Sequence, residues 1–108
     1  MQTNFEIVKR EMIWGTYGKG GVEHCAGHCL KHKLQWVKLI DRETSHLQAI
    51  LRTQRQIQGH MCQTVIESIL ADRGVKPDKF SYEAERKLMD DISVADRRWR
   101  EEQRQKPS

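Results

Sequence analysis

The sequence predicts an all-α fold of three to four helices, and three observations support this prediction. Apolar residues recur three and four positions apart through most of the 108-residue chain, as they do on the buried stripe of a helix. No proline precedes Pro77, so no proline interrupts those stripes. Thr3 and Ser81 stand where a hydroxyl group can cap the start of a helix.

The first helix is predicted from a capping box, in which Thr3 is followed three residues later by Glu6. Apolar side chains recur at helical spacing over residues 5–13, and Gly15 is placed to end the helix. A strand is the alternative, because the isoleucines of this stretch also alternate with charged residues. The glycine-rich segment that follows predicts a loop. It lacks the spacing of a phosphate-binding loop, since Gly20 stands where such a loop has a serine or threonine.

Residues 22–73 carry two apolar stripes that meet across residues 41–46, and two interpretations remain open. One is a single helix of about fifty residues, roughly 75 Å long. The other is a helical hairpin that breaks at the meeting point, where Ser45 and Gln48 can form a second capping box. A rod of that length would bury little surface against its own chain, which favours the hairpin unless the protein is a dimer.

A last helix is predicted over about residues 81–104, with Ser81 as its cap. Its apolar residues follow steps of four, three and four, which form a narrow coiled-coil-like seam on an otherwise charged helix. The seam consists of Leu88, Ile92, Ala95 and Trp99. The chain then ends without apolar side chains. We therefore expect one helical domain over residues 1–104 and a frayed tail over residues 105–108.

Three histidines and two cysteines fall between His24 and His32, which raises the question of a metal site. On a helix the histidines would lie four residues apart, and side chains at this spacing can hold one cation. The candidate zinc ligands are Cys25, His28, Cys29, His32, His60 and Cys62. The chain lacks the C-x-x-C knuckle of structural zinc sites, and free cysteines pack as small hydrophobes. We therefore expect no metal or other cofactor, with a zinc-binding module at residues 24–32 as an alternative.

No acidic residue occurs from Thr44 to Ile66, and basic residues outnumber acidic ones in the first half of the chain. Arginine, glutamine and threonine on an acid-free helical face suit contacts with phosphates and base edges. They suit a polar interface between helices equally well. Nucleic-acid binding through residues 31–55 is therefore the principal alternative function. Its candidate residues are Lys31, Lys38, Arg42, Arg52 and Arg55.

Three tryptophans against two phenylalanines is an unusual balance, and tryptophan is enriched at the energetic centres of protein interfaces. Trp99 stands in a charged stretch, while Trp14 and Tyr17 border the glycine-rich segment. We expect these three residues to bind a partner, although the three tryptophans would be equally ordinary as core anchors. Trp36 falls on the first central stripe and is expected in the core.

No residues in the sequence form a recognisable catalytic arrangement, so we expect no enzymatic activity. No apolar run approaches the roughly 20 residues of a membrane span, and the odd number of cysteines suits a reducing compartment, so we expect a cytoplasmic protein. The sequence thus indicates a small accessory protein that binds and modulates a larger protein or nucleoprotein assembly. Its low hydrophobic share, 37%, would suit a homodimer. Short chains of this kind are often encoded by viruses and mobile elements, which suggests such an origin.

Overall fold

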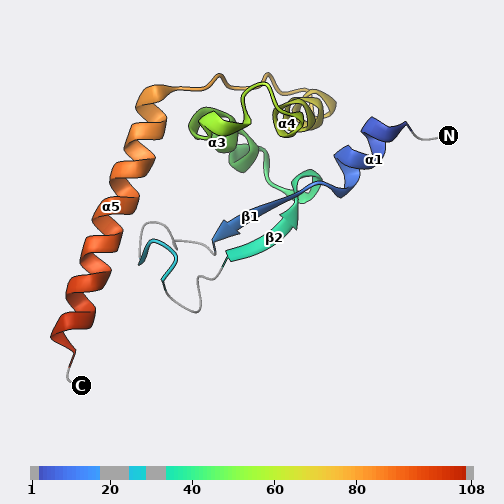
Figure 1. Cartoon of the computed structure of the whole chain (residues 1–108). Coiled ribbons are helices and arrows are strands. Elements are labelled where there is room, and N and C mark those ends of the chain that lie inside the picture. Colours follow the sequence, from blue (N-terminus) through green and yellow to red (C-terminus); the bar gives the residue numbers. More distant parts are fainter. Residues whose placement is uncertain (1–2, 18–24, 29–33, 107–108) are drawn as a thin grey trace. The chain divides into compact units, whose positions relative to one another are not determined.

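The computed structural model describes residues 3–17, 25–28 and 34–106. These residues are mostly α-helical and include a two-stranded antiparallel sheet (Figure 1). Their elements, in chain order and with η marking a 3-10 helix, are α1 (Asn4–Glu11), β1 (Ile13–Tyr17), β2 (Leu34–Lys38), η2 (Leu39–Asp41), α3 (Thr44–Thr53), η3 (Arg55–Ile57), α4 (Met61–Asp72) and α5 (Tyr82–Gln105).

The sheet contradicts the all-α prediction. β1 and β2 appear as opposing arrows in Figure 1, and the Leu39 amide donates a hydrogen bond to the Met12 carbonyl at 2.9 Å just beyond the paired residues. Both strands contain β-branched and aromatic residues, which prefer a pleated, half-buried surface to a helix. Each strand has five residues, and periodicity alone does not separate so short a segment from part of a helical stripe.

The capping box at the start of α1 is confirmed. The Thr3 hydroxyl accepts from the Glu6 amide at 3.1 Å, and the Glu6 carboxylate accepts from the Thr3 amide at 3.1 Å. α1 ends at Met12, whose extended backbone leads directly into β1. Gly15 therefore lies inside a strand and does not end the helix as predicted.

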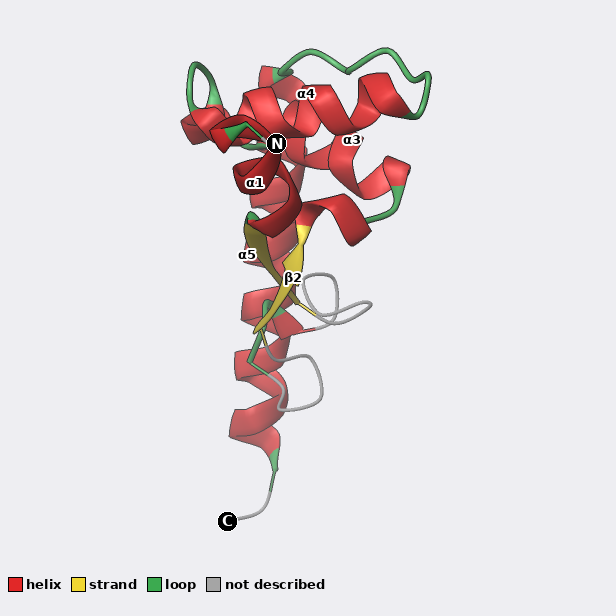
Figure 2. Ribbon diagram, turned by 90° about the vertical axis from the view of Figure 1, so that its right-hand side faces the viewer, coloured by secondary structure: helices red, strands yellow, loops and turns green. Residues whose placement is uncertain are grey.

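The single helix, one of the two interpretations of residues 22–73, is also wrong, because β2, two 3-10 turns and two separate α-helices occupy much of this range. α3 and α4 lie side by side (Figure 2), and residues 54–60 interrupt the α-helical structure between them. Gly59 lies in this break with φ +78°, a conformation that glycine adopts without strain. α3 begins at Thr44, within the break predicted at residues 41–46, but β2 and a 3-10 turn precede this point in place of the first helix of the predicted hairpin.

The chain divides into two compact units, of which the first comprises residues 1–14 and 36–85 and the second residues 15–35 and 86–108. The first unit contains a hydrophobic cluster built mainly by α3 and α4. Its buried members are Leu39, Leu47, Ile50, Leu51, Ile57, Val65, Ile66, Ile69 and Leu70. Phe5 and Val8 of α1 pack against this cluster. The apolar stripes read from the sequence thus become the facing sides of two short helices.

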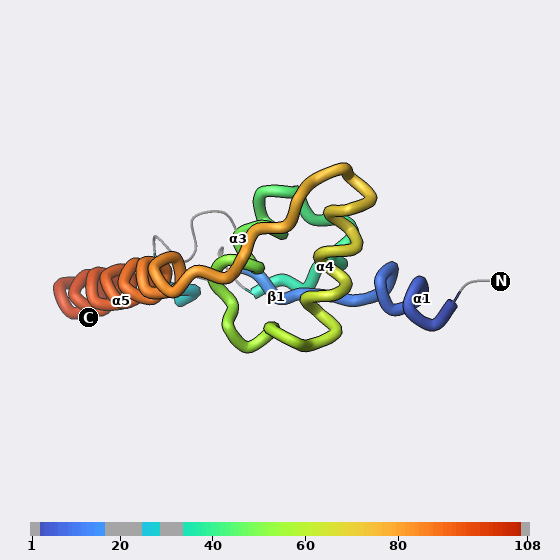
Figure 3. Tube along the Cα trace, turned by 90° about the horizontal axis from the view of Figure 1, so that it is seen from above, coloured from blue at the N-terminus to red at the C-terminus, as the bar shows by residue number. Residues whose placement is uncertain are grey.

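An extended segment, residues 75–80, leaves α4 and passes α3 before α5 begins (Figure 3). Gln48 of α3 holds this segment: its amide nitrogen donates to the Lys76 carbonyl at 2.8 Å, and its amide oxygen accepts from the Asp78 amide at 2.7 Å. The capping box predicted for Gln48 is therefore wrong, since its side chain is used here and Glu43 is the N-cap. The Ser81 hydroxyl accepts from the Ala84 amide at 3.1 Å at the start of α5, which corresponds to the helix predicted over residues 81–104.

Candidate functional site

The histidine and cysteine cluster does not lie on a continuous helix. Ala26 and Gly27 have φ values of +51° and +86°, in the left-handed region, and the His28 amide donates to the Cys25 carbonyl at 3.0 Å. The chain turns at these residues, so the expected helical stripe of histidines four apart is broken. Cys25 is fully buried, which is the environment expected for a thiol that packs like a small hydrophobic side chain.

Within the described part of the chain, no group of three or more histidine, cysteine or acidic side chains is placed to hold a metal ion. His28 instead pairs with Asp96, and His28 Nε2 lies 2.5 Å from Asp96 Oδ1. Cys62 is half-buried against the core, and burial raises the pKa of its thiol, which disfavours the thiolate that zinc requires. His60 is exposed at the N-cap of α4. The remaining candidate ligands, which lie outside the described residues, are Cys29 and His32.

Two of the basic residues predicted to contact nucleic acid have acidic partners in the first unit. Lys38 Nζ lies 3.1 Å from Glu11 Oε2, and Arg52 Nη1 lies 2.6 Å from Asp78 Oδ2. Asp78 stands outside the acid-free stretch that contains Arg52 and reaches it only through the fold, and Glu11 is likewise distant from Lys38 in the sequence. Lys31 lies outside the described residues. The expected basic stripe is therefore largely neutralised where it is described.

Arg55 is the most extensively bonded of the predicted phosphate contacts. Its Nη2 and Nε donate to the Glu85 carboxylate at 2.6 and 3.3 Å, and this pairing raises the pKa of the guanidinium. The guanidinium carbon also lies 5.7 Å from the centre of the Tyr82 ring. A phosphate would therefore compete with a carboxylate and an aromatic ring that already contact Arg55.

Arg42, another predicted phosphate contact, is half-buried beside His46. Its Nη1 lies 3.5 Å from His46 Nδ1, while its Nε and Nη2 are buried without a hydrogen-bond partner among the described residues. Burial, followed by the charge of Arg42, lowers the pKa of His46. Two of the three guanidinium nitrogens of Arg42 are thus covered, which leaves a phosphate little access to them.

The three residues predicted to bind a partner differ in their surroundings. Trp14 is half-buried and packs against the core of the first unit, so it acts as an anchor. The side chain of Tyr17 lies outside the described part of the structure. Trp99 belongs to the second unit, where it lines a surface hollow together with His28. Trp99 is thus a predicted partner-binding residue that lines a hollow on the protein surface.

Trp36, expected in the core, is 64% exposed. The hydrogen bond between Leu39 and Met12 sets the register of the two strands and places Lys38 opposite Ile13. Trp36 lies two residues before Lys38 in β2, so its side chain is on the same face of the sheet as Lys38 and Ile13. Ile13 is 52% exposed. We call these two exposed side chains, Ile13 and Trp36, the ribbon face. Side chains alternate between the two faces of a strand, and this alternation was the signal in the sequence for an exposed Trp36. The signal was missed because the segment was interpreted as part of a helix.

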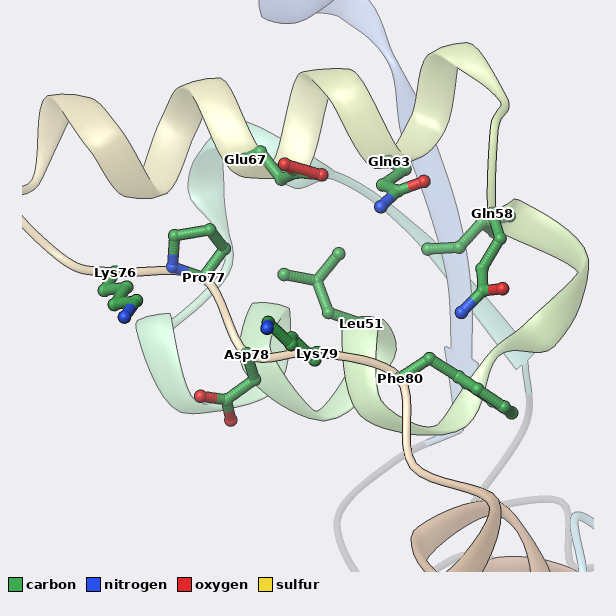
Figure 4. A pocket seen from close by; sticks show the side chains of 10 residues that line it. Leu51, Gln58, Gln63, Glu67, Lys76, Pro77, Asp78, Lys79 and Phe80 are labelled. Atoms are coloured by element: carbon green, nitrogen blue, oxygen red, sulfur yellow. The ribbon is translucent and has the colours of Figure 1, made fainter.

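A groove of about 370 Å³ opens in the first unit beside α4 and the extended segment that follows it (Figure 4). Leu51 and Ile57 contribute apolar surface to it, and Figure 4 shows Gln63 and Glu67 projecting from α4 toward Leu51. Its polar rim consists of Gln58, Gln63, Glu67, Lys76, Asp78 and Lys79. Acidic, basic and amide groups alternate around this rim, so its chemistry selects no single class of ligand.

Comparisons of the chain with protein-family models, curated proteins and solved structures find no match. Among the described residues, no helix is both long enough and apolar enough to cross a membrane.

Proposed function

We propose that the chain is a non-enzymatic accessory protein that binds a larger protein or nucleoprotein assembly through the ribbon face and modulates it. The observation that carries this proposal is the 64% exposure of Trp36. Tryptophan is among the largest apolar side chains and is highly buried on average, so a tryptophan this exposed leaves much apolar surface in contact with water.

The neighbours of Trp36 support a protein partner. Ile13 adds a second exposed apolar side chain on the same face, and the pair of Lys38 and Glu11 supplies a charged rim that is neutral as a whole. An aromatic anchor with an aliphatic neighbour and a polar rim is the composition of an interface hot spot. A neutral rim gives no attraction to a polyanion, which favours a protein surface.

The matched test replaces exposed apolar residues one at a time. Trp36→Ser and Ile13→Ser should each reduce retention of the partner assembly at least tenfold in affinity capture from the native host, because each removes apolar contact area. Met61→Ser is the control, since Met61 is 52% exposed like Ile13 but lies on α4. It should retain the same proteins as the original chain.

Two results would contradict the proposal. One is an identical set of captured proteins for Trp36→Ser and Met61→Ser, with both variants folded by circular dichroism. The other is a dimer of the original chain, seen by light scattering, that dissociates in Trp36→Ser. In that case the ribbon face would be covered by a second copy.

A further inference from the structure

The net charge of the chain lies entirely in its second unit. The first unit has nine lysines and arginines against nine acidic residues, whereas the second has ten against six, which accounts for the net charge of +4. This charge distribution is not evident when charges are counted in the two halves of the sequence, because the second unit combines two separate segments. A polyanion attracted to this protein would therefore meet the second unit.

A surface hollow of about 380 Å³ lies on the C-terminal half of α5 in this unit. Its lining combines an aromatic ring, an imidazole, an amide and two guanidinium groups. The lining residues are His28, Trp99, Arg100, Gln103 and Arg104. No acidic side chain contributes to this lining within the described residues. The hollow thus offers cations and hydrogen-bond donors around one large ring.

Asp96, one helical turn before Arg100 on α5, holds two of these side chains in place. Its Oδ1 lies 2.5 Å from His28 Nε2, and its Oδ2 accepts from Arg100 Nε at 3.0 Å. These bonds, that of His28 first, lower the pKa of the Asp96 carboxyl and keep it ionised. Because Arg100 is bound through Nε, its two terminal nitrogens remain available to an anion. The site is oriented before a ligand arrives.

Trp99 supplies a stacking surface with cationic surroundings. The His28 ring is nearly parallel to it, at an interplanar angle of 10° and with centroids 6.0 Å apart. The ammonium group of Lys106 lies 5.8 Å from the Trp99 centroid, near the outer limit of a cation–π contact. Lys106 is exposed, so a flat ligand ring can displace its ammonium group at little cost, while His28 stays bonded to Asp96.

The arginines beside the hollow continue along one face of α5. Arg97, Arg100 and Arg104 follow at steps of three and four residues, which places them within one face over about 10 Å. Arg97 and Arg104 are exposed and have no acidic partner among the described residues, unlike Arg52 in the first unit. The second unit therefore presents three guanidinium groups in a row, of which that of Arg100 is bonded through Nε to Asp96.

We propose that this surface binds single-stranded nucleic acid, with a base stacked on Trp99 and backbone phosphates on Arg100 and Arg104. A single strand exposes the faces of its bases, and an aromatic ring within a cationic groove is the usual way to bind it without sequence preference. A duplex buries those faces in its own stack, so it would leave Trp99 unused. An acidic peptide would pair with the arginines but has no flat ring for Trp99.

The test measures binding of a fluorescent oligothymidylate of about 15 nucleotides to the full chain by anisotropy, in about 50 mM salt. Arg100→Gln/Arg104→Gln should weaken binding at least tenfold and reduce the slope of log affinity against log salt by about 1.4. Trp99→Leu should weaken binding about tenfold through lost stacking. The control is Arg52→Gln/Arg55→Gln, which removes the same charge from the first unit and should change affinity less than twofold.

The proposal is overturned if the original chain does not bind the oligonucleotide, or if both double variants weaken binding equally. Tighter binding of a duplex of the same length, with no effect of Trp99→Leu, would overturn the single-stranded assignment. Displacement of the oligonucleotide by an equal charge concentration of polyglutamate would assign the surface to acidic peptides instead. Circular dichroism of each variant separates loss of binding from loss of fold.

Discussion

Burial changes the chemistry of individual side chains in the first unit, and His46 is the clearest case. Its imidazole is half-buried beside the Arg42 guanidinium. Burial first, and then the positive charge of Arg42, disfavours the protonated ring and lowers its pKa. The folded protein therefore holds His46 neutral at pH values where an exposed histidine would begin to bind a proton.

This makes His46 a determinant of acid stability. As the pH falls below the ordinary value of 6.5, the unfolded chain binds a proton at His46 that the folded chain does not, so stability is lost. Between about pH 7.5 and about pH 5, the original chain should lose more unfolding free energy than His46→Gln does. Urea denaturation at both pH values measures this difference. An equal loss in both proteins, or an NMR titration of His46 with a midpoint at or above 6.5, would contradict it.

At the scale of elements, short helices and strands depend on the surfaces they cover. α3 has ten residues, and an isolated helix of that length is marginal in water. It is stabilised by burying Leu47, Ile50 and Leu51 in the core of the first unit. The extended segment after α4 has no regular hydrogen bonds of its own, so it depends on side chains of α3 in the same way.

Gln48 should therefore control the order of that segment. Gln48→Ala removes the bonds to the Lys76 carbonyl and the Asp78 amide, which together should cost about 1–2 kcal/mol of unfolding free energy. Hydrogen exchange at the Asp78 amide should accelerate more than exchange in α4. Gln56→Ala is the matched control, because the exposed Gln56 side chain bonds, among the described residues, only the side chain of Gln54. Equal effects of both substitutions would refute the assigned role.

At the scale of the whole molecule, core and charge are divided between the two units. The first unit has the large hydrophobic cluster and no net charge, while the second has the entire net charge of +4. Among the described residues, the first unit thus contains most of the apolar burial that stabilises the protein. The second presents the electrostatic surface.

Stability should accordingly respond to the core of the first unit. Leu47 is fully buried, so Leu47→Ala should lower the unfolding free energy by about 2–5 kcal/mol through lost burial and a residual cavity. Met61 is 52% exposed on the neighbouring helix, and Met61→Ala should change it by less than about 0.5 kcal/mol. Chemical denaturation followed by far-ultraviolet circular dichroism compares them. Similar losses for both variants would show that the cluster is not the main source of stability.

The sequence by itself determined the features that depend on neighbours within one or two helical turns. Thr3 and Glu6 marked the start of α1, and Ser81 marked the start of α5 to within one residue. The apolar stripes of α3 and α4 were also visible, because a helix repeats its buried side at a fixed interval. These signals act between residues that are close in the chain, so they survive without knowledge of the fold.

The tertiary structure alone decided the features that join distant residues. β1 and β2 exist because they pair with each other across the chain, and their pairing turned Trp36 from an expected core residue into an exposed one. Arg52 seemed free in an acid-free stretch but is neutralised by Asp78. Neither outcome follows from local periodicity, because strand register and ion pairing are set by which surfaces pack together once the core has formed.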